Sequence, residues 1–145
     1  MTVIAILGTL AGSFLTGALQ YAGQQAQRAA EELAARRAAG LDAVAGLSAA
    51  LADHRRAMWV REEIRLADGD WDAARAESHV TRSAVTGPLL RVRLVLPELT
   101  DAAQHAAQAA YDMRAVNSPA GLQEARERAL QAADSLVAAG TTLTA

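Results

Sequence analysis

Titratable and aromatic side chains gather in one stretch of the sequence, between Asp53 and Arg82. Such a concentration suits metal ligation, acid–base or nucleophilic catalysis, or the docking of a partner on aromatic and arginine side chains. The candidate partner-docking or hairpin ion-pair surface comprises Arg55, Arg56, Trp59, Arg61, Glu62, Trp71, Arg75, Glu77, His79 and Arg82.

The spacing of the histidines and carboxylates argues against a metal site. Carboxylate-bridged metal sites in helical bundles use a Glu-x-x-His spacing, which places both ligands on one helix face. Here Glu77 lies two positions before His79, and Asp101 lies four positions before His105. We therefore expect no metal and no other cofactor.

Enzymatic motifs are missing as well. Ser78 beside His79 would point in a different direction on a helix, and no strand–turn–helix elbow or glycine-rich phosphate loop is evident. The sequence therefore predicts a non-enzymatic protein with no small-molecule substrate. Two interpretations of the cluster stay open: a solvated helical hairpin with weak salt bridges, or a protein-docking surface.

The charge balance makes nucleic acid an unexpected partner. The 14 basic residues are all arginine, and 16 acidic residues leave a formal charge of −2. Acidic neighbours offset the pair Arg55 and Arg56, and no basic recognition helix is evident. We expect membrane, one or more protein partners or self-association, and no direct contact with nucleic acid.

The first charged side chain of the sequence is Arg28, so residues 1–27 form a long uncharged segment. Its apolar residues extend over about twenty positions, the length of a helix that crosses a hydrocarbon core of about 30 Å. We interpret residues 1–27 as a membrane anchor helix. A soluble or peripheral regulatory protein, with this helix packed in its own core, is the alternative, and a cleaved secretory signal is a weaker one.

Basic residues after this segment predict its orientation. Arg28, Arg36 and Arg37 would stay on the cytoplasmic side, so we expect a single-pass protein of the cell membrane with its N-terminus outside and its C-terminus in the cytoplasm. Small residues share one side of the predicted membrane helix, where a second helix can approach closely. These helix-packing residues are Gly8, Gly12 and Gly17.

Residues 28–140 predict a cytoplasmic helical bundle. Apolar residues recur there at spacings of three and four, as on one face of a buried helix. We expect a hairpin turn near residues 67–70, where Gly69 takes the left-handed conformation and Asp70 caps the second arm. The stripe of the first arm is Leu41, Val44, Leu47, Leu51, His54 and Met58.

The second half of the chain predicts further helices. We expect breaks near residues 87–88 and 117–119, because proline follows at each place, and a flexible tail over 141–145 after Gly140. Residues 89–96 alternate like a strand, but an isolated strand has no pairing partner, so we favour helix there. The fold class is all-α: a membrane helix that continues into a long hairpin and a small antiparallel bundle. The later stripes are Leu99, Ala103, Ala106, Ala110 and Met113, then Leu122, Ala125, Ala129, Ala133 and Leu136.

The chain resembles the KilB family of small membrane-associated proteins from actinobacterial conjugative plasmids. The segments that carry the resemblance are Leu7–Gly12, Asp53–Trp59, Asp70–His79 and Thr81–Val85. The resemblance implies an accessory role in plasmid transfer, in the spread of plasmid through the recipient mycelium, beside a separate DNA-translocating ATPase. It implies no catalytic residues.

Overall fold

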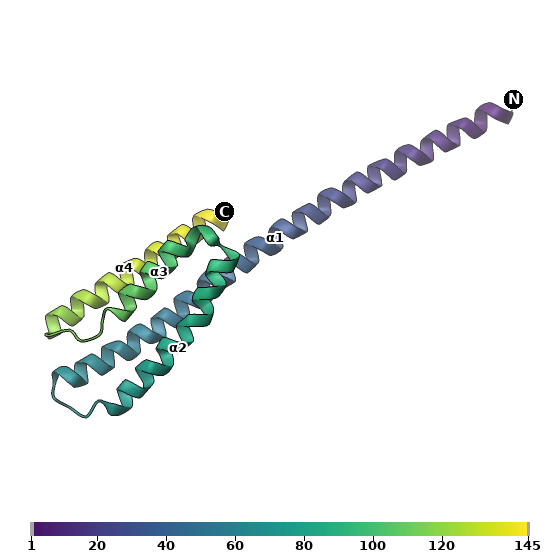
Figure 1. Ribbon diagram of the computed structural model, residues 1–145. Helices are drawn as coiled ribbons and strands as arrows, with labels where there is room; N and C mark the ends of the chain where they lie inside the picture. Colours follow the sequence, from purple (N-terminus) through teal and green to yellow (C-terminus); the bar gives the residue numbers. More distant parts are fainter. Residues whose placement is uncertain (1, 145) are drawn as a thin grey trace. The chain divides into compact units, whose positions relative to one another are not determined.

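The computed structural model describes the backbone of residues 2–144 and the side chains of Tyr21 and residues 23–143. All of the regular structure in this part of the chain is helical, which confirms the all-α prediction (Figure 1). The elements are α1 (Thr2–Leu66), α2 (Asp72–Val95), the short 3-10 helix η1 (Pro97–Leu99), α3 (Thr100–Tyr111) and α4 (Pro119–Thr144).

The chain divides into two units, residues 1–37 and residues 38–145. In the first unit the backbone is helical from Thr2, and the side chains of Tyr21 and residues 23–37 are exposed. The side chains of residues 1–20, including Gly8, Gly12 and Gly17 of the predicted membrane-packing face, lie outside the described residues. Within the described residues, no helix combines the length and the apolarity that a membrane-spanning segment requires.

The second unit is an antiparallel bundle built from residues 38–66 of α1 together with α2, α3 and α4 (Figure 1). Contacts along the bundle fix which helices are neighbours. His54 of α1 contacts Thr81 of α2, and Arg82 of α2 lies over the ring of Tyr111 of α3. Since α4 packs against both α3 and α1, the four segments enclose one core.

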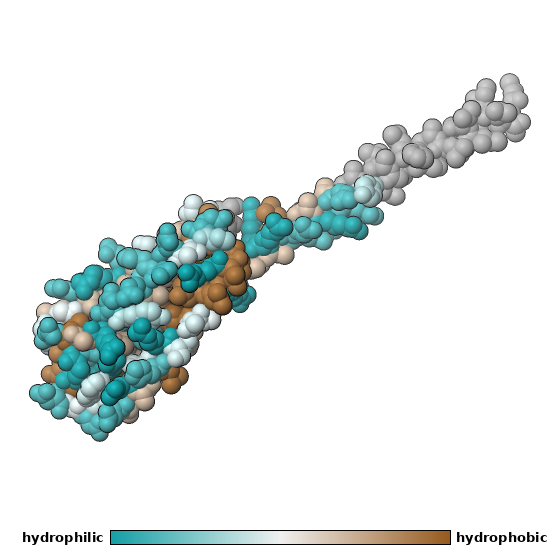
Figure 2. Space-filling model, in the orientation of Figure 1, coloured by the Kyte–Doolittle hydropathy of each residue, from teal (hydrophilic) through white to brown (hydrophobic). Residues whose placement is uncertain are grey.

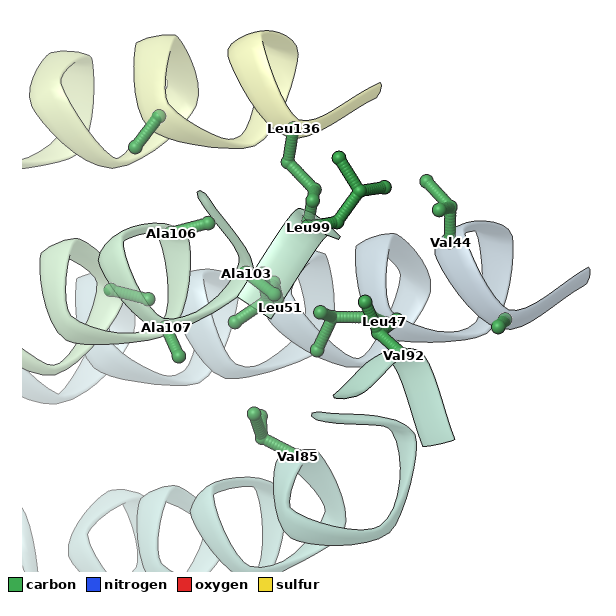
Figure 3. Close-up of a cluster of buried hydrophobic side chains, with 13 residues drawn as sticks. Val44, Leu47, Leu51, Val85, Val92, Leu99, Ala103, Ala106, Ala107 and Leu136 are labelled. Carbon is green, nitrogen blue, oxygen red and sulfur yellow. The ribbon is translucent and has the colours of Figure 1, made fainter. Parts of the chain in front are cut away.

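The core at one end of the bundle gathers side chains from every helix and from η1 (Figure 3). Many of its members are alanines, which let the helix axes approach closely. Buried apolar side chains of this cluster are Ala43, Val44, Leu47, Leu51, Val85, Val92, Leu99, Ala103, Ala106, Ala107, Ala110, Ala132 and Leu136. The stripe predicted from Leu99 to Met113 is confirmed at all five positions, because each is buried.

A second apolar cluster lies nearer the turn between α1 and α2. Met58 of α1 meets Met113 and the buried face of α4 there, and Trp59 packs against the cluster from outside. His54 and Met58 are both buried, as the predicted stripe requires. Leu41 is the exception: the prediction that it is buried is wrong, because its side chain is 51% exposed at the start of the bundle.

The turn between α1 and α2 differs in detail from the expected geometry. Asp68, not Gly69, takes the left-handed conformation, with φ of 53°. The N–H of Gly69 donates to the carbonyl of Ile64, and aspartate tolerates this backbone conformation better than most residues do. The carboxylate of Asp70 accepts from the N–H of Asp72 at 3.1 Å, so it closes a local turn, while Trp71 stands at the N-cap.

Proline 88 does not interrupt α2, so the predicted break near residues 87–88 is wrong. Val85 and Val92, on either side of the proline, are both buried in the core. The free energy gained by burying these side chains offsets the loss of the backbone N–H that proline lacks. Residues 89–95 are therefore helix. Their alternation arises because Val92 faces the core while Leu90 and Leu94 face outward.

The predicted stop at Gly140 and the separate tail after it are also wrong, because α4 continues to Thr144. Gly140 is buried against α1, and a Cβ placed on it would lie 3.0 Å from a methyl group of Val44. Its role is close packing of α4 on α1. The hydroxyls of Thr141 and Thr142 donate to the carbonyls of Val137 and Ala138 and add side-chain hydrogen bonds to the last turns.

The break predicted near 117–119 corresponds to the loop of residues 112–118. Ser118 precedes Pro119, the first residue of α4, and its hydroxyl accepts from the N–H of Gly121 at 3.1 Å. This is the arrangement of a capping serine before a proline in the first turn.

Candidate partner-docking site

The bundle distributes the ten predicted surface residues over α1, the turn after it and α2. Arg61 and Glu62 point inward, between α1 and α2, where they join three residues that were not predicted for the surface. We call this group the inner polar cluster: His54, Arg61, Glu62, Ser78 and Thr81. Arg55, Arg56 and Trp59 lie on the side of α1 that meets α4. The two faces have different chemistry, so the sequence cluster is not one site.

Glu62 is the most deeply buried charged side chain in the inner polar cluster, with no exposed surface. Arg65, one turn further along α1, donates to its carboxylate at 2.6 Å and also donates to the carbonyl of Val116 in the loop before α4. The guanidinium of Arg61 approaches the other carboxylate oxygen at 3.4 Å. Glu62 thus connects the end of α1 to the loop between α3 and α4.

His54 is buried without a charged partner. Its Nδ1 lies 3.0 Å from the hydroxyl of Thr81, and its ring meets the ring of Tyr111 edge-on at 5.4 Å. Burial, and then the nearby positive charges of Arg82 and Arg61, lower the pKa of His54 from 6.5 to about 4. The imidazole is therefore neutral at physiological pH.

Trp71 lies between two guanidinium groups at the mouth of the inner polar cluster. Arg61 and Arg75 lie 5.1 and 5.6 Å from its ring, within the range of cation–π contact. Arg61 also donates to the hydroxyl of Ser78 at 3.3 Å. Arg61 is buried, and its hydrogen bond to Ser78 and its contact with the Trp71 ring both lie inside the bundle, so Arg61 is a structural residue.

Three further residues of the predicted surface, Glu77, His79 and Arg82, are exposed on α2. Glu77 and His79 take part in no ion pair among the described residues, so the predicted ion pairs between the two arms near the turn are wrong. The reason is rotational: position 78, between them, faces the core. An ion pair joins these helices at the other end of the bundle, where Arg91 lies 2.6 Å from Asp42.

On the opposite side of α1, Trp59 is half-buried against α4 and lies between two pockets. The first, which we call the arginine pocket, has a volume of about 420 Å³. Three arginines line it, and the guanidinium of Arg126 lies 5.1 Å from the Trp59 ring. Its lining residues are Ala52, Arg55, Arg56, Trp59, Arg126 and Leu130.

The second pocket, which we call the apolar pocket, lies on the side of Trp59 that is nearer the loops and has a volume of about 230 Å³. One carboxylate, Glu63, stands among otherwise apolar lining residues. These residues are Trp59, Glu63, Leu66, Ala67, Pro119 and Leu122. The two pockets share the indole of Trp59, and together they form what we call the Trp59 groove.

Sequence reasoning identified the α1 side of this groove and missed the α4 side. The sequence predicts Arg55, Arg56 and Trp59 as surface residues and Leu122 as a buried residue of the last helix, but it does not single out Arg126. Glu124 and Arg128 form an ion pair at 4.0 Å on another face of α4. The spacing of the α4 stripe places Leu122 on the buried side, but nothing in it shows that α4 packs beside Trp59.

An apolar area is visible on the second unit beside the C-terminal part of α2 (Figure 2). Leu90 and Leu94 are 54% and 73% exposed in that part of the helix. Among the described residues, no three histidine or acidic side chains converge as metal ligands would.

Comparisons with known proteins place this helical chain in a family. The model of the KilB plasmid transfer protein family matches residues 41–144, which include every residue of the Trp59 groove. Protein KilB of Streptomyces lividans is 52% identical over 141 residues, covering 95% of this chain and 93% of the relative. No solved structure matches the chain. The chain belongs to the KilB plasmid transfer protein family.

Proposed function

We propose that this chain is a non-enzymatic, membrane-anchored interaction protein that serves as an accessory in conjugative plasmid transfer or in the spread of plasmid through the mycelium. The observation that carries the interaction role is the Trp59 groove. Tryptophan and arginine are the residues that most often dominate the energy of protein interfaces, and here they line a concave surface on a rigid helical frame. The process comes from the family to which the chain belongs.

The membrane part of the proposal rests on the sequence. Residues 1–27 carry no charged side chain, and Arg28, Arg36 and Arg37 follow within about two and a half helical turns. By the positive-inside rule, the second unit then lies in the cytoplasm and the N-terminal side lies outside the membrane. The Trp59 groove would accordingly face cytoplasmic partners at the membrane.

Membrane attachment is tested by fractionation with an alkaline carbonate wash, on the full chain and on a chain that starts at Arg28. We expect the full chain in the membrane pellet and the shortened chain in the soluble fraction with its helicity retained. If both chains are soluble, residues 1–27 belong to a protein core and the anchor is wrong.

Self-association in the membrane is part of the same proposal, because Gly8, Gly12 and Gly17 would let two helices approach closely. Replacing Gly8 and Gly12 by leucine should lower dimer formation in a membrane dimerisation assay. Equal dimer formation by the variant and the original sequence would contradict this part of the proposal.

The docking role is tested by a plasmid-transfer assay with Trp59→Ala in the full chain. We expect transfer to fall while the circular dichroism spectrum and membrane attachment stay unchanged, because the indole is half-buried at the outer edge of the core. Arg128→Gln, on another face of α4, is the matched control and should leave transfer unchanged. Normal transfer by a folded Trp59→Ala protein would refute the docking role.

A further inference from the structure

The two pockets of the Trp59 groove differ in the kind of ligand group that they accept. Three arginines and no acidic residue are among the residues that line the arginine pocket. The apolar pocket is lined by two leucines, an alanine, a proline and Trp59, with the single carboxylate of Glu63. A ligand that fills both must therefore carry negative charge at one end and an apolar group at the other.

The positive charge in the arginine pocket is only partly neutralised by the protein. Arg56 is paired with Asp53 at 3.0 Å, whereas Arg55 and Arg126 take part in no ion pair among the described residues. Burial and the neighbouring Arg126 lower the pKa of Arg55, and Asp134 opposes this effect. Two like charges held together in a chain of net charge −2 form a local site for an anion.

The planar geometry of guanidinium favours carboxylate or phosphate, which accept two parallel hydrogen bonds from it. The length of the groove indicates the size of the ligand. From Ala52 to Leu66 it follows fourteen residues of α1, or about 21 Å, which is the reach of about six residues of an extended peptide.

We infer that the Trp59 groove binds an extended acidic segment of a protein partner, with one apolar side chain in the apolar pocket and carboxylates on Arg55 and Arg126. This inference deepens the proposed docking function and rests on it. A peptide suits the site better than nucleic acid does, because Glu63 lines the apolar pocket and would repel a continuing phosphate backbone. The apolar pocket, which lies beside the arginine pocket, also suits an apolar amino-acid side chain better than the polar sugar of a nucleic acid.

The test is fluorescence anisotropy with the full chain in detergent micelles and short fluorescein-labelled peptides. Because the groove does not fix the direction of the peptide, two probes of opposite order are used: Gly-Leu-Ser-Asp-Glu-Asp-Glu-Gly and Gly-Glu-Asp-Glu-Asp-Ser-Leu-Gly. We expect saturable binding of at least one probe that weakens as the NaCl concentration rises. Replacing its acidic residues by Asn and Gln should abolish binding, and replacing its leucine by glycine should weaken binding.

The protein variants locate the site. Arg126→Gln should weaken binding about tenfold, as the loss of one charge-assisted hydrogen bond implies. Arg128→Gln, two residues along the same helix on a different face, should change binding by no more than about twofold. Both side chains are exposed on α4, so neither substitution removes a core contact.

Equal binding of the acidic and neutral probes, or equal effects of the two arginine variants, would overturn the inference. Displacement of the bound probe by a short DNA duplex at a lower concentration than by unlabelled peptide would also overturn it, since phosphate would then be the preferred occupant. Failure of this inference is distinguishable from failure of the proposed function. If no probe binds but Trp59→Ala still lowers plasmid transfer, the docking role stands and the acidic peptide is wrong.

Discussion

Acidification from pH 7 to pH 4 should destabilise the second unit through His54. The side chain is 1% exposed, and its burial together with Arg82 and Arg61 lowers the pKa from 6.5 to about 4. Between these two pH values the unfolded chain holds a proton on His54 that the folded chain does not. Acid therefore favours unfolding over this window, and the stabilisation is fully present only above about pH 6.5.

The size of the effect follows from the same two values. At about 1.36 kcal/mol for each pKa unit, the lowering from 6.5 to about 4 corresponds to a loss of about 3 kcal/mol in the free energy of unfolding. That is a large fraction of the stability of a small domain. The loss should be nearly complete at pH 4.

The assay is urea unfolding of the full chain, followed by tryptophan fluorescence at several pH values. Both tryptophans lie in the second unit, so the signal reports the unfolding of the bundle. His54→Gln cannot take up a proton, and its pH dependence should be flatter by about 3 kcal/mol between pH 6.5 and pH 4. His105→Gln, at an exposed position of α3, is the control and should keep the original pH dependence. The same pH dependence in His54→Gln and the original sequence would refute the account of a buried, neutral imidazole.

Two further predictions concern the packing of the bundle and use the same fluorescence assay. Glu62→Gln should lower the free energy of unfolding by about 3 kcal/mol, because it leaves the buried guanidinium of Arg61 without its carboxylate. A loss below about 1 kcal/mol would show that this ion pair is solvated. Gly140→Ala should destabilise the bundle by about 1 kcal/mol or more, because the new Cβ would lie 3.0 Å from a methyl group of Val44. The control is Gly46→Ala, whose Cβ would meet no atom within 4 Å. This substitution should stabilise α1 by up to about 1 kcal/mol. Stabilisation by both alanines would contradict the tight α1–α4 contact.

The buried stripes were predictable because they depend on spacing alone. Residues from Leu99 to Met113 recur every three or four positions, and a helix with that pattern has one face to bury. The helix ends and breaks predicted from proline and glycine are wrong where tertiary contacts override the local backbone preference of these residues. Pro88 is tolerated because Val85 and Val92 hold α2 on the core, and Gly140 continues the helix because α4 must approach Val44.

The candidate site was likewise predictable only in part. The types of residue in the Trp59 groove are visible in the sequence on the α1 side, at Arg55 and Trp59. The partner helix is not, because the contact between Trp59 and Arg126 joins positions far apart in the chain. Sequence periodicity gives the face that each helix buries, but the pairing of α1 with α4 depends on the packing of the whole bundle. Likewise, Arg61 and Glu62 are residue types that usually lie on the surface, but the rotation of α1 buries both side chains in the bundle.

Binding of a protein partner at the Trp59 groove is tested most directly by site-specific photocross-linking during plasmid transfer. A photoreactive amino acid replaces Leu130, which lines the arginine pocket, or Gln104, which is exposed on α3 away from it. Our account predicts one defined cross-linked product from position 130, none from position 104, and loss of the product in the Arg126→Gln background. Equal products from both positions, or a product from position 130 that survives Arg126→Gln, would contradict the account.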